Sequence, residues 1–319
     1  MKIARIGALL GATALAVGVA GPALAQTKNV MVTAIVEHPA LDATRDGVRD
    51  ELEAQGIDFE FTYESAQGNP ATAAQIARQF VGEEPDVIVA IATPSAQAVV
   101  AATQEIPVVF TAVTDPVGAQ LVSDPDNPGG NVTGVSDMSP IQDHLNLIRE
   151  ILPDAKTLGV PYNPGEANAV ALVNLINELA PEVGFTIVEA PATKSSEALG
   201  AAQSLIGRSD AIYVPTDNTI VSALEAVLSV GTDNGIPVFS GDTDSVERGA
   251  IATVGFNYYQ IGRQTGKVVA EVLNGADPGS IPVQPATGTD LFVNPAAAEK
   301  MGVTLSQELI GRATKVVGQ

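Results

Sequence analysis

Residues 86–117 read DVIVAIATPSAQAVVAATQEIPVVFTAVTDPV, and this stretch alone predicts the fold class. It begins with an apolar run over 87–91, turns at Ala92-Thr93-Pro94 and continues in a helical pattern from Ser95. A second apolar run over 108–110 leads into the polar segment 111–116. Short apolar runs bounded by turn residues predict buried strands, so the stretch is a strand–helix–strand unit with polar loops after its strands.

The same order of elements returns later in the chain. Residues 210–246 read DAIYVPTDNTIVSALEAVLSVGTDNGIPVFSGDTDSV, and Ile-Pro-Val recurs about 130 residues after its first occurrence. A separation of this size indicates a repeated domain. Ligands of open parallel sheets bind beyond the carboxyl ends of the strands. Two such sheets that face each other would place 93–95 and 114–115 opposite Asp217 and Asp242, with a ligand between them.

Composition bounds the function. The 319 residues are 45% hydrophobic and 17% charged, which is enough for two domains of roughly 130–150 residues each. A net charge of −21 without Lys/Arg clusters argues against nucleic acid as a partner. The absence of Cys excludes disulfides and thiolate chemistry. The two histidines, His38 and His144, do not have metal-site spacing, and no cofactor or metal is expected.

The first 25 residues have the pattern of a secretory signal peptide. Lys2 and Arg5 form a basic start, residues 6–21 are apolar and small, and 23–25 read Ala-Leu-Ala, a cleavage pattern. We expect cleavage between Ala25 and Gln26. No Cys follows that would carry a lipid anchor and no later segment is long and apolar enough to span a membrane, so the mature chain is expected to be free in the periplasm.

The remaining chain alternates apolar runs with helical patterns, which predicts an α/β protein with parallel sheets covered on both faces. We expect two Rossmann-like lobes joined by a multi-strand hinge that the chain crosses about three times. Lobe one comprises 26–133 and 255–284, and lobe two comprises 134–254 and 285–319.

Six segments of the sequence resemble a known family. They read VEHPALDATRDGV, TPSAQAVVAAT, IPVVFTAVTDPVGAQLV, NVTGVSD, YVPTDNTIVSALEAV and IPVFSGDTDSVERGA. They are similar to the periplasmic substrate-binding components of ABC transporters, above all to the tryptophan and aromatic amino-acid binding proteins. The resemblance covers the mature chain and implies the type I periplasmic-binding fold, closure of a monomer around a small ligand, and delivery of that ligand to ABC permease subunits without catalysis.

If the ligand is an amino acid, as the resemblance suggests, its carboxylate needs donors. The turn Thr93-Pro94-Ser95-Ala96 opens a helix, and a helix N-terminus offers unpaired N–H groups and a favourable dipole. We expect the hydroxyls of Thr93 and Ser95 and the N–H groups of Ser95 and Ala96 to bind the carboxylate. Ordinary capping of the helix by Thr93 is the alternative.

The ammonium group of such a ligand needs acceptors, preferably charged ones. Asp217 and Asp242 follow adjacent strands of lobe two and are the expected pair. An empty carboxylate pair repels itself, and a cation relieves the repulsion, which would couple binding to closure. The alternative is that Asp217 caps a helix and Asp242 lies in a solvated turn.

Other residues at the strand ends complete the expected site. Tyr162 is the candidate for packing against a ligand side chain, and the scarcity of aromatic residues leaves a smaller apolar or branched amino acid open. His38 and His144 are expected to be structural. The further candidate contacts are Glu37, Gln67, Asn69, Thr114, Ser136 and Asp137, with Asp115 as a weaker one.

Two other functions remain open at this point. A secreted α/β enzyme is disfavoured because the chain has no G-x-S-x-G elbow, no Cys and no histidine beside an obvious nucleophile, although paired aspartates are able to act as acid and base. A periplasmic sensor that docks on a membrane receptor would use the same closed form as an importer component, so the residues do not separate the two.

Overall fold

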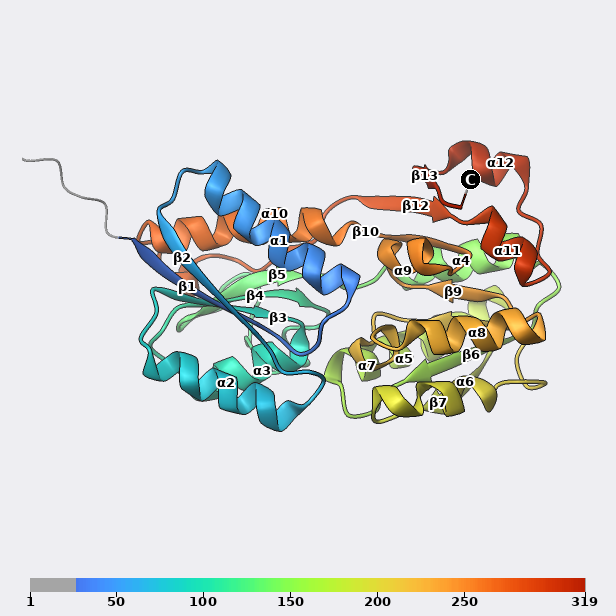
Figure 1. Cartoon of the computed structure of the whole chain (residues 1–319), viewed down its shortest axis with the longest axis horizontal. Helices are drawn as coiled ribbons and strands as arrows, with labels where there is room; N and C mark the ends of the chain where they lie inside the picture. Colours follow the sequence, from blue (N-terminus) through green and yellow to red (C-terminus); the bar gives the residue numbers. More distant parts are fainter. Residues whose placement is uncertain (1–26, 319) are drawn as a thin grey trace, which may run out of the picture.

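The computed structural model describes residues 27–318, so the expected signal peptide lies outside the described residues. Two lobes lie side by side along the long axis of the molecule, each with a sheet covered by helices (Figure 1). Among the described helices, none has the length and apolar character needed to cross a membrane. The architecture is α/β, as expected.

Lobe one contains a six-stranded sheet in the order β11-β5-β4-β3-β1-β2, and every neighbouring pair is parallel. The helices α1 and α10 cover one face, and α2 and α3 cover the other (Figure 1). The elements of this lobe are β1 Lys28–Ala34, α1 Pro39–Ala54, β2 Phe59–Ser65, α2 Pro70–Gly82, β3 Val87–Ile91, α3 Thr93–Ala102, β4 Val108–Val113, β5 Val132–Ser136, α10 Tyr258–Leu273, η3 Pro278–Ser280 and β11 Gln284–Pro285.

Lobe two has a parallel sheet in the order β7-β6-β8-β9 and a second sheet, β10-β12-β13, in which β10 and β12 are antiparallel. Its elements are α4 Ile141–Ile151, β6 Thr157–Tyr162, α5 Ala167–Leu179, η1 Ala180–Val183, β7 Thr186–Pro191, η2 Ser195–Glu197, α6 Ala198–Gln203, β8 Ala211–Val214, α7 Asn218–Val221, α8 Leu224–Asn234, β9 Val238–Ser240, α9 Thr243–Arg248, β10 Ala252–Phe256, β12 Thr289–Val293, α11 Pro295–Lys300, α12 Gln307–Arg312 and β13 Lys315–Val316.

The chain crosses between the lobes after β5, after β10 and after β11. The first crossing falls three residues later than the expected boundary at 133, because β5 continues to Ser136 in the lobe-one sheet. The second falls after Phe256 instead of before 255, because β10 pairs with β12 in lobe two over its whole length. The third follows β11, which pairs with β5 at the edge of the lobe-one sheet.

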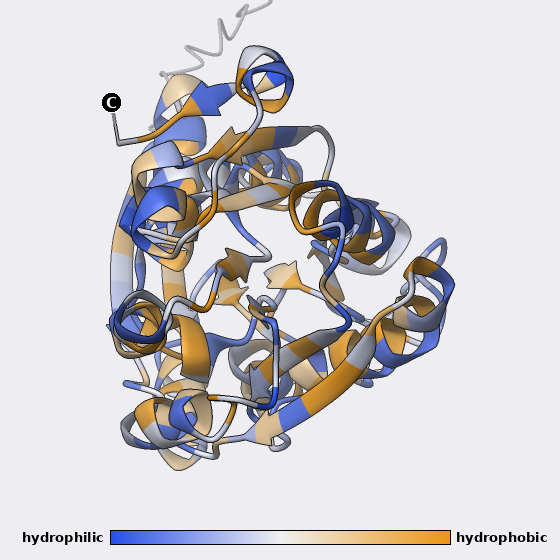
Figure 2. Ribbon diagram, turned by 90° about the vertical axis from the view of Figure 1, so that its right-hand side faces the viewer, coloured by the Kyte–Doolittle hydropathy of each residue, from blue (hydrophilic) through white to orange (hydrophobic). Residues whose placement is uncertain are grey.

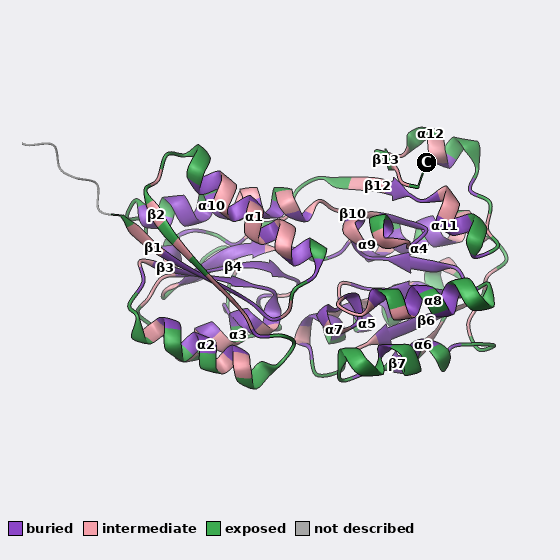
Figure 3. Cartoon of the chain, in the orientation of Figure 1, coloured by how far each residue is buried: buried purple, intermediate pink, exposed green. Residues whose placement is uncertain are grey.

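Each lobe has its own hydrophobic core, to which both strands and helices contribute. β3 and β4 are buried along their whole length, as the uninterrupted apolar runs of their sequences predict for strands covered on both faces. Figure 3 shows the buried strands between helices whose outer sides are exposed. Figure 2, a view from the lobe-two end, shows strands with many hydrophobic residues and, around them, helices that carry hydrophilic residues.

Helices α1 and α10 pack closely because glycines lie at their contact. A Cβ atom added to Gly262 of α10 would lie within 3.0 Å of the carbonyl oxygen of Thr44 on α1, and one added to Gly47 would meet the carbonyl oxygen of Tyr259 in the same way. Both obstacles are backbone atoms, which move only if the helices move apart. The pair therefore fixes α10, which follows the second crossing, to lobe one.

Gly262→Ala should lower the free energy of unfolding by about 1–3 kcal/mol, because the added methyl group overpacks the contact between α1 and α10. Urea unfolding measures the change. Gly200→Ala on α6 is the matched control, since a Cβ atom there meets no atom within 4 Å and alanine is the better helix former. Equal stability of the Gly262 variant and the wild type would contradict the prediction.

Candidate functional site

The carboxyl ends of the strands in both lobes face each other around an inner cavity. The space in it that is open to a water-sized group is about 20 Å³, which holds one or two such groups. Both lobes and the hinge contribute to its wall, and none of the described residues that line it is Lys or Arg. The lining residues are His38, Ala40, Leu41, Ala112, Thr114, Asp137, Asn168, Thr216, Asp217, Asn218, Val221, Asp242 and Tyr258.

A larger outer cleft of about 610 Å³ adjoins this cavity, and Asn218 lines both spaces. Most of the described residues that line the outer cleft are polar, and none of them is aromatic. Lobe one contributes Ile35, Val36, Gln67, Gly68, Asn69, Pro70 and Pro94, and lobe two contributes Asn163, Gly165, Glu166, Thr193, Lys194, Ser195, Ser196, Asn218, Thr219 and Ser222.

Asp217 and Asp242 both line the inner cavity, as expected, and each also caps a helix. Asp217 Oδ1 accepts the N–H of Ile220 at 2.8 Å and Oδ2 accepts the N–H of Asn163 at 2.5 Å. Asp242 accepts the N–H of Ser245 at 2.7 Å and its hydroxyl at 2.6 Å. Capping and lining therefore coexist, and Asp242 is buried, not in a solvated turn. The caps hold both carboxyl groups in fixed positions.

Burial makes both carboxyl groups weaker acids than usual. Burial and the charge of Glu166 raise the pKa of Asp217 to about 8, although backbone N–H groups oppose the shift. Burial also raises the pKa of Asp242, against the hydrogen bonds from Ser245. A positive group placed in the cavity would favour the charged form of both carboxyl groups.

Glu166 is a central residue of this region that the sequence did not single out. It is buried, and its Oε2 accepts the side-chain N–H of Asn218 at 2.5 Å and that of Asn168 at 3.3 Å. Its Oε1 accepts the backbone N–H and the hydroxyl of Thr219. The available indication was the acidic residue at the end of the loop 163–166 after a strand, but only the fold shows that it reaches the start of α7.

The hinge contributes a third buried carboxyl group, Asp137. It accepts hydrogen bonds from the hydroxyls of Tyr258 (2.7 Å) and Thr114 (3.4 Å). Burial raises its pKa in spite of these two bonds. Asp137 follows the first crossing and Tyr258 the second, so their bond ties two of the three crossing segments together at the wall of the cavity.

The N-terminus of α3 differs from the expectation in two ways. The helix begins at Thr93 with Ala92 as its cap, so Thr93 does not cap it. The N–H of Ala96 donates to the Ala92 carbonyl at 3.0 Å, so it is not free for a ligand. However, the hydroxyls of Thr93 and Ser95 are buried without a hydrogen-bond partner on either side of Pro94, which lines the outer cleft. Ala92 has a φ of 72°, which is unfavourable for a residue other than glycine.

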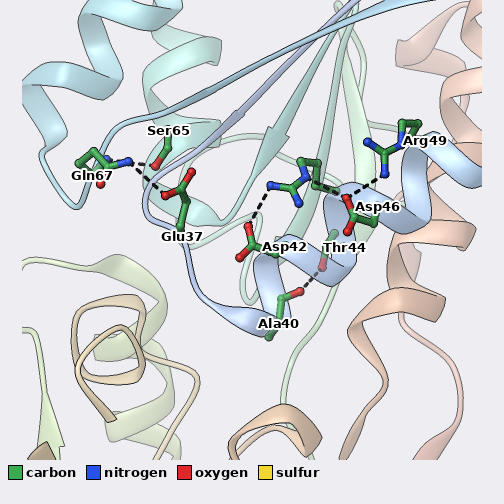
Figure 4. Close-up of polar contacts among 9 residues, drawn as sticks. Glu37, Ala40, Asp42, Thr44, Asp46, Arg49, Ser65 and Gln67 are labelled. Carbon is green, nitrogen blue, oxygen red and sulfur yellow. Dashed lines mark hydrogen bonds and ion pairs between the residues drawn. The ribbon is translucent and has the colours of Figure 1, made fainter. Parts of the chain in front are cut away.

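Gln67 lines the outer cleft, and Glu37 lies beside Gln67 in lobe one (Figure 4). The side-chain N–H of Gln67 donates to Glu37 at 3.4 Å, and both residues are exposed. Asn69 lines the cleft and caps α2 by accepting the N–H groups of Ala71 and Thr72. The expected contribution of this loop to the cleft is thus present in the geometry.

Thr93, Ser95 and Ala96 are not among the residues that line the cavity or the cleft, although Pro94 between them lines the cleft. Three further expected residues also lie outside both linings. Tyr162 is half-buried, its hydroxyl donates to Glu189 on the neighbouring strand at 2.8 Å, and it is not among the residues that line the cavity or the cleft. This position does not support packing against a ligand. Ser136 ends β5 and pairs there with β11, outside both linings. Asp115 accepts the N–H of Gly118 within its own turn.

The two histidines occupy different environments. His144 is buried in lobe two, where its ring nitrogens bond the Tyr213 hydroxyl (2.5 Å) and the Val254 carbonyl (2.6 Å). Its role is structural, as expected. His38 lines the inner cavity and is buried, and its Nδ1 has no hydrogen-bond partner. The described residues contain no cluster of three or more His, Cys, Asp or Glu that would hold a metal ion.

The comparisons with known proteins agree with this geometry. The model of the ABC transporter substrate-binding protein family matches residues 29–317. A tyrosine-binding protein of Clostridioides difficile is 40% identical over 271 residues, which are 84% of this chain and 79% of the relative. The chain therefore belongs to the ABC transporter substrate-binding protein family.

The arrangement of the lobes in this chain can be compared with that in two solved structures. An ABC domain in complex with L-Trp from Streptococcus pneumoniae is 33% identical, with a TM-score of 0.88 over 92% of this chain and all of the other. A ligand-free, open substrate-binding protein from Clostridium difficile is 38% identical, but its TM-score is only 0.69 over the same shares. The chain thus matches the ligand-bound structure better despite the lower identity, which indicates that its lobes are closed.

The structural relatives have the type I periplasmic-binding fold, which confirms the fold expected from the repeat and the resemblance. The family consists of solute-binding proteins, and the chain is accordingly a binding protein and not an enzyme. This finding contradicts the alternative of a secreted α/β enzyme.

Proposed function

We propose that this chain captures an amino acid with an apolar or aromatic side chain between its lobes and delivers it to the permease of an ABC importer. The observation that carries the proposal is the character of the inner cavity. Three carboxyl groups, those of Asp137, Asp217 and Asp242, line a space with room for one small group, and no cationic side chain lines it. An ammonium group has the charge and size that this space accepts.

The ligand carboxylate would lie at the N-terminus of α3. Buried hydroxyls without partners are costly, by about 1–3 kcal/mol each, unless a ligand satisfies them. Thr93 and Ser95 present two such hydroxyls beside the cleft-lining Pro94. Hydroxyls and a helix N-terminus together are able to bind a carboxylate without arginine.

The ligand side chain would occupy the outer cleft, because the inner cavity is too small for a ring. The outer cleft has a volume of about 610 Å³, which is ample for an aromatic side chain. A relative named as a tyrosine-binding protein and a related structure with bound L-Trp support an aromatic ligand. The lack of aromatic residues among the described lining residues keeps smaller apolar side chains open.

The remaining parts of the proposal follow from the role. The mature chain, exported by the segment 1–25, would act as a monomer in the periplasm and present its closed form to the permease. Closure would rotate two rigid lobes about the three crossing segments, as hinged binding proteins do.

A thermal-shift screen of the mature protein against the twenty amino acids and a panel of sugars and polyols tests the function. A ligand at a hundredfold excess over its dissociation constant stabilises the native state by about 2.7 kcal/mol. We expect shifts with one or a few amino acids and none with their analogues that lack the amino group. Shifts confined to sugars, or their absence with every amino acid, would overturn the proposal.

Ligand affinity should fall as the pH is lowered from 8 to 6. The pKa of Asp217 is raised to about 8 in the empty site, and an ammonium neighbour would lower it. Binding is therefore fully favoured above that pKa, and below it each ligand must displace a proton, at a cost approaching tenfold in affinity per pH unit. Calorimetric titration at three pH values measures this. An affinity that is constant or rises on acidification would contradict the prediction.

A further inference from the structure

The inner cavity contains two buried acceptor atoms that have no hydrogen-bond partner. They are Nδ1 of His38, from the loop between β1 and α1 of lobe one, and Oδ1 of Asn168, on α5 of lobe two. His38 is 8% exposed and Asn168 is 4% exposed. His38 occupies the N-cap position of α1, but its side chain makes no capping bond. The imidazole is therefore free for another role.

The tautomer of His38 decides whether its unpaired nitrogen accepts or donates a hydrogen bond. Asn218 of lobe two also lines the cavity and favours the protonated form of the ring. A proton on Nε2 leaves a lone pair on Nδ1, and a cation beside Nδ1 favours this tautomer.

The imidazole is also neutral in the closed protein. Burial, together with the positive charge of Arg248, lowers the pKa of His38 to about 3, and the bond to Asn218 opposes this only in part. The carboxyl groups of Asp137, Asp217 and Asp242 line the same cavity. A neutral ring with a lone pair on Nδ1 is an acceptor for a cation that carries N–H donors.

We infer that His38, in the tautomer protonated on Nε2, is a ligand-binding residue whose Nδ1 accepts an N–H of the ligand ammonium. This inference rests on the proposed function. An ammonium has three N–H donors, and the cavity offers three kinds of acceptor for them: His38 Nδ1, Asn168 Oδ1 and an aspartate carboxylate. Because His38 belongs to lobe one and Asn168 to lobe two, the ammonium joins the lobes and favours the closed form.

Three substitutions of His38 test the inference, with the amino acid that binds best in the thermal-shift screen and its analogue without the amino group as probes. His38→Phe keeps a ring but has no acceptor and should weaken binding of the amino acid by tenfold or more. His38→Asn places an amide oxygen near the Nδ1 position and should retain most of the affinity. His38→Gln has its amide near the Nε2 position and should behave like His38→Phe.

The analogue without the amino group separates ligand contact from a general structural effect. His38→Phe should leave the affinity for that analogue unchanged within about twofold, because the lost bond is to the ammonium. Nitrogen-15 NMR of the wild-type imidazole should show an unprotonated Nδ1 whose resonance shifts on addition of the amino acid and not of the analogue.

The outcomes distinguish a failure of the proposed function from a failure of the inference about His38. If no amino acid binds the wild type, the proposed function itself fails. If an amino acid binds and His38→Phe weakens both probes equally, weakens neither, or the spectrum shows a protonated Nδ1, only the inference about His38 is overturned. If His38→Phe does not fold, His38→Gln and the wild-type spectrum carry the same test.

Discussion

Asp217→Asn should weaken amino-acid binding by roughly tenfold to over a hundredfold. The carboxyl group lines the inner cavity and is completely buried. A hydrogen bond to a charged group contributes about 1.5–3 kcal/mol, which is the loss expected when the ionised form is no longer available. The variant should also be less stable without ligand, because each carboxyl oxygen accepts a backbone N–H and an amide nitrogen is unable to accept one.

The measurement is calorimetric titration of the variant beside Asp242→Asn, for which a loss of similar size is expected. Asp210→Asn is the matched control. Asp210 accepts the N–H groups of Lys156 and Thr157 at the start of β6, the end of the strand away from the cleft. Its replacement should lower stability without changing affinity. Unchanged affinity in both cavity variants would remove the assignment of the ammonium to this cavity.

Ser95→Ala should lower affinity by a comparable factor, and in this case the stability of the ligand-free protein should stay the same or rise. The Ser95 hydroxyl is buried without a partner, so its removal ends a desolvation cost instead of breaking a bond. In the complex the same hydroxyl would donate to the ligand carboxylate, and a charge-assisted bond would be lost. A buried group that binds the ligand and has no partner in the protein should show such opposite changes in stability and affinity when it is removed.

Thermal unfolding with and without the ligand measures both quantities in one experiment. Thr253→Val is the control, because the hydroxyl of Thr253 is also buried and unpaired but lies beside His144 and Tyr213. It should change stability in the same direction as Ser95→Ala and leave affinity alone. An affinity of the Ser95 variant equal to that of the wild type would show that the carboxylate does not lie at α3.

The fold and part of the site were predictable because they depend on local patterns. Apolar runs ending in polar tips located the carboxyl ends of the strands, and the topology of parallel sheets then brought Asp217, Asp242 and Thr114 to one cavity. The sequence placed the start of α3 one residue late. The positive φ of Ala92 is a strained conformation, and an alanine gives no indication of it in the sequence.

Residues whose roles depend on the other lobe were not predictable in the same way. His38 and Asn168 line one cavity from different lobes, and no spacing in the sequence relates them. The prediction that Tyr162 packs against the ligand was not supported, for a different reason. The interior of β6 is buried along its whole length, so its sequence has no alternation that shows which way the last side chain points.

The three crossings also determine the order in which the molecule is completed. The strands β6–β9 of lobe two lie within one continuous stretch, 157–240, whereas lobe one needs α10 and β11 from the far side of that stretch. Contacts between distant segments slow folding. Lobe one therefore stays incomplete until residue 285 is available, and lobe two needs β12 and β13, which end at residue 316, for its second sheet. The cleft, which needs both lobes, is the last part of the molecule to exist, so a partly folded chain does not retain solute.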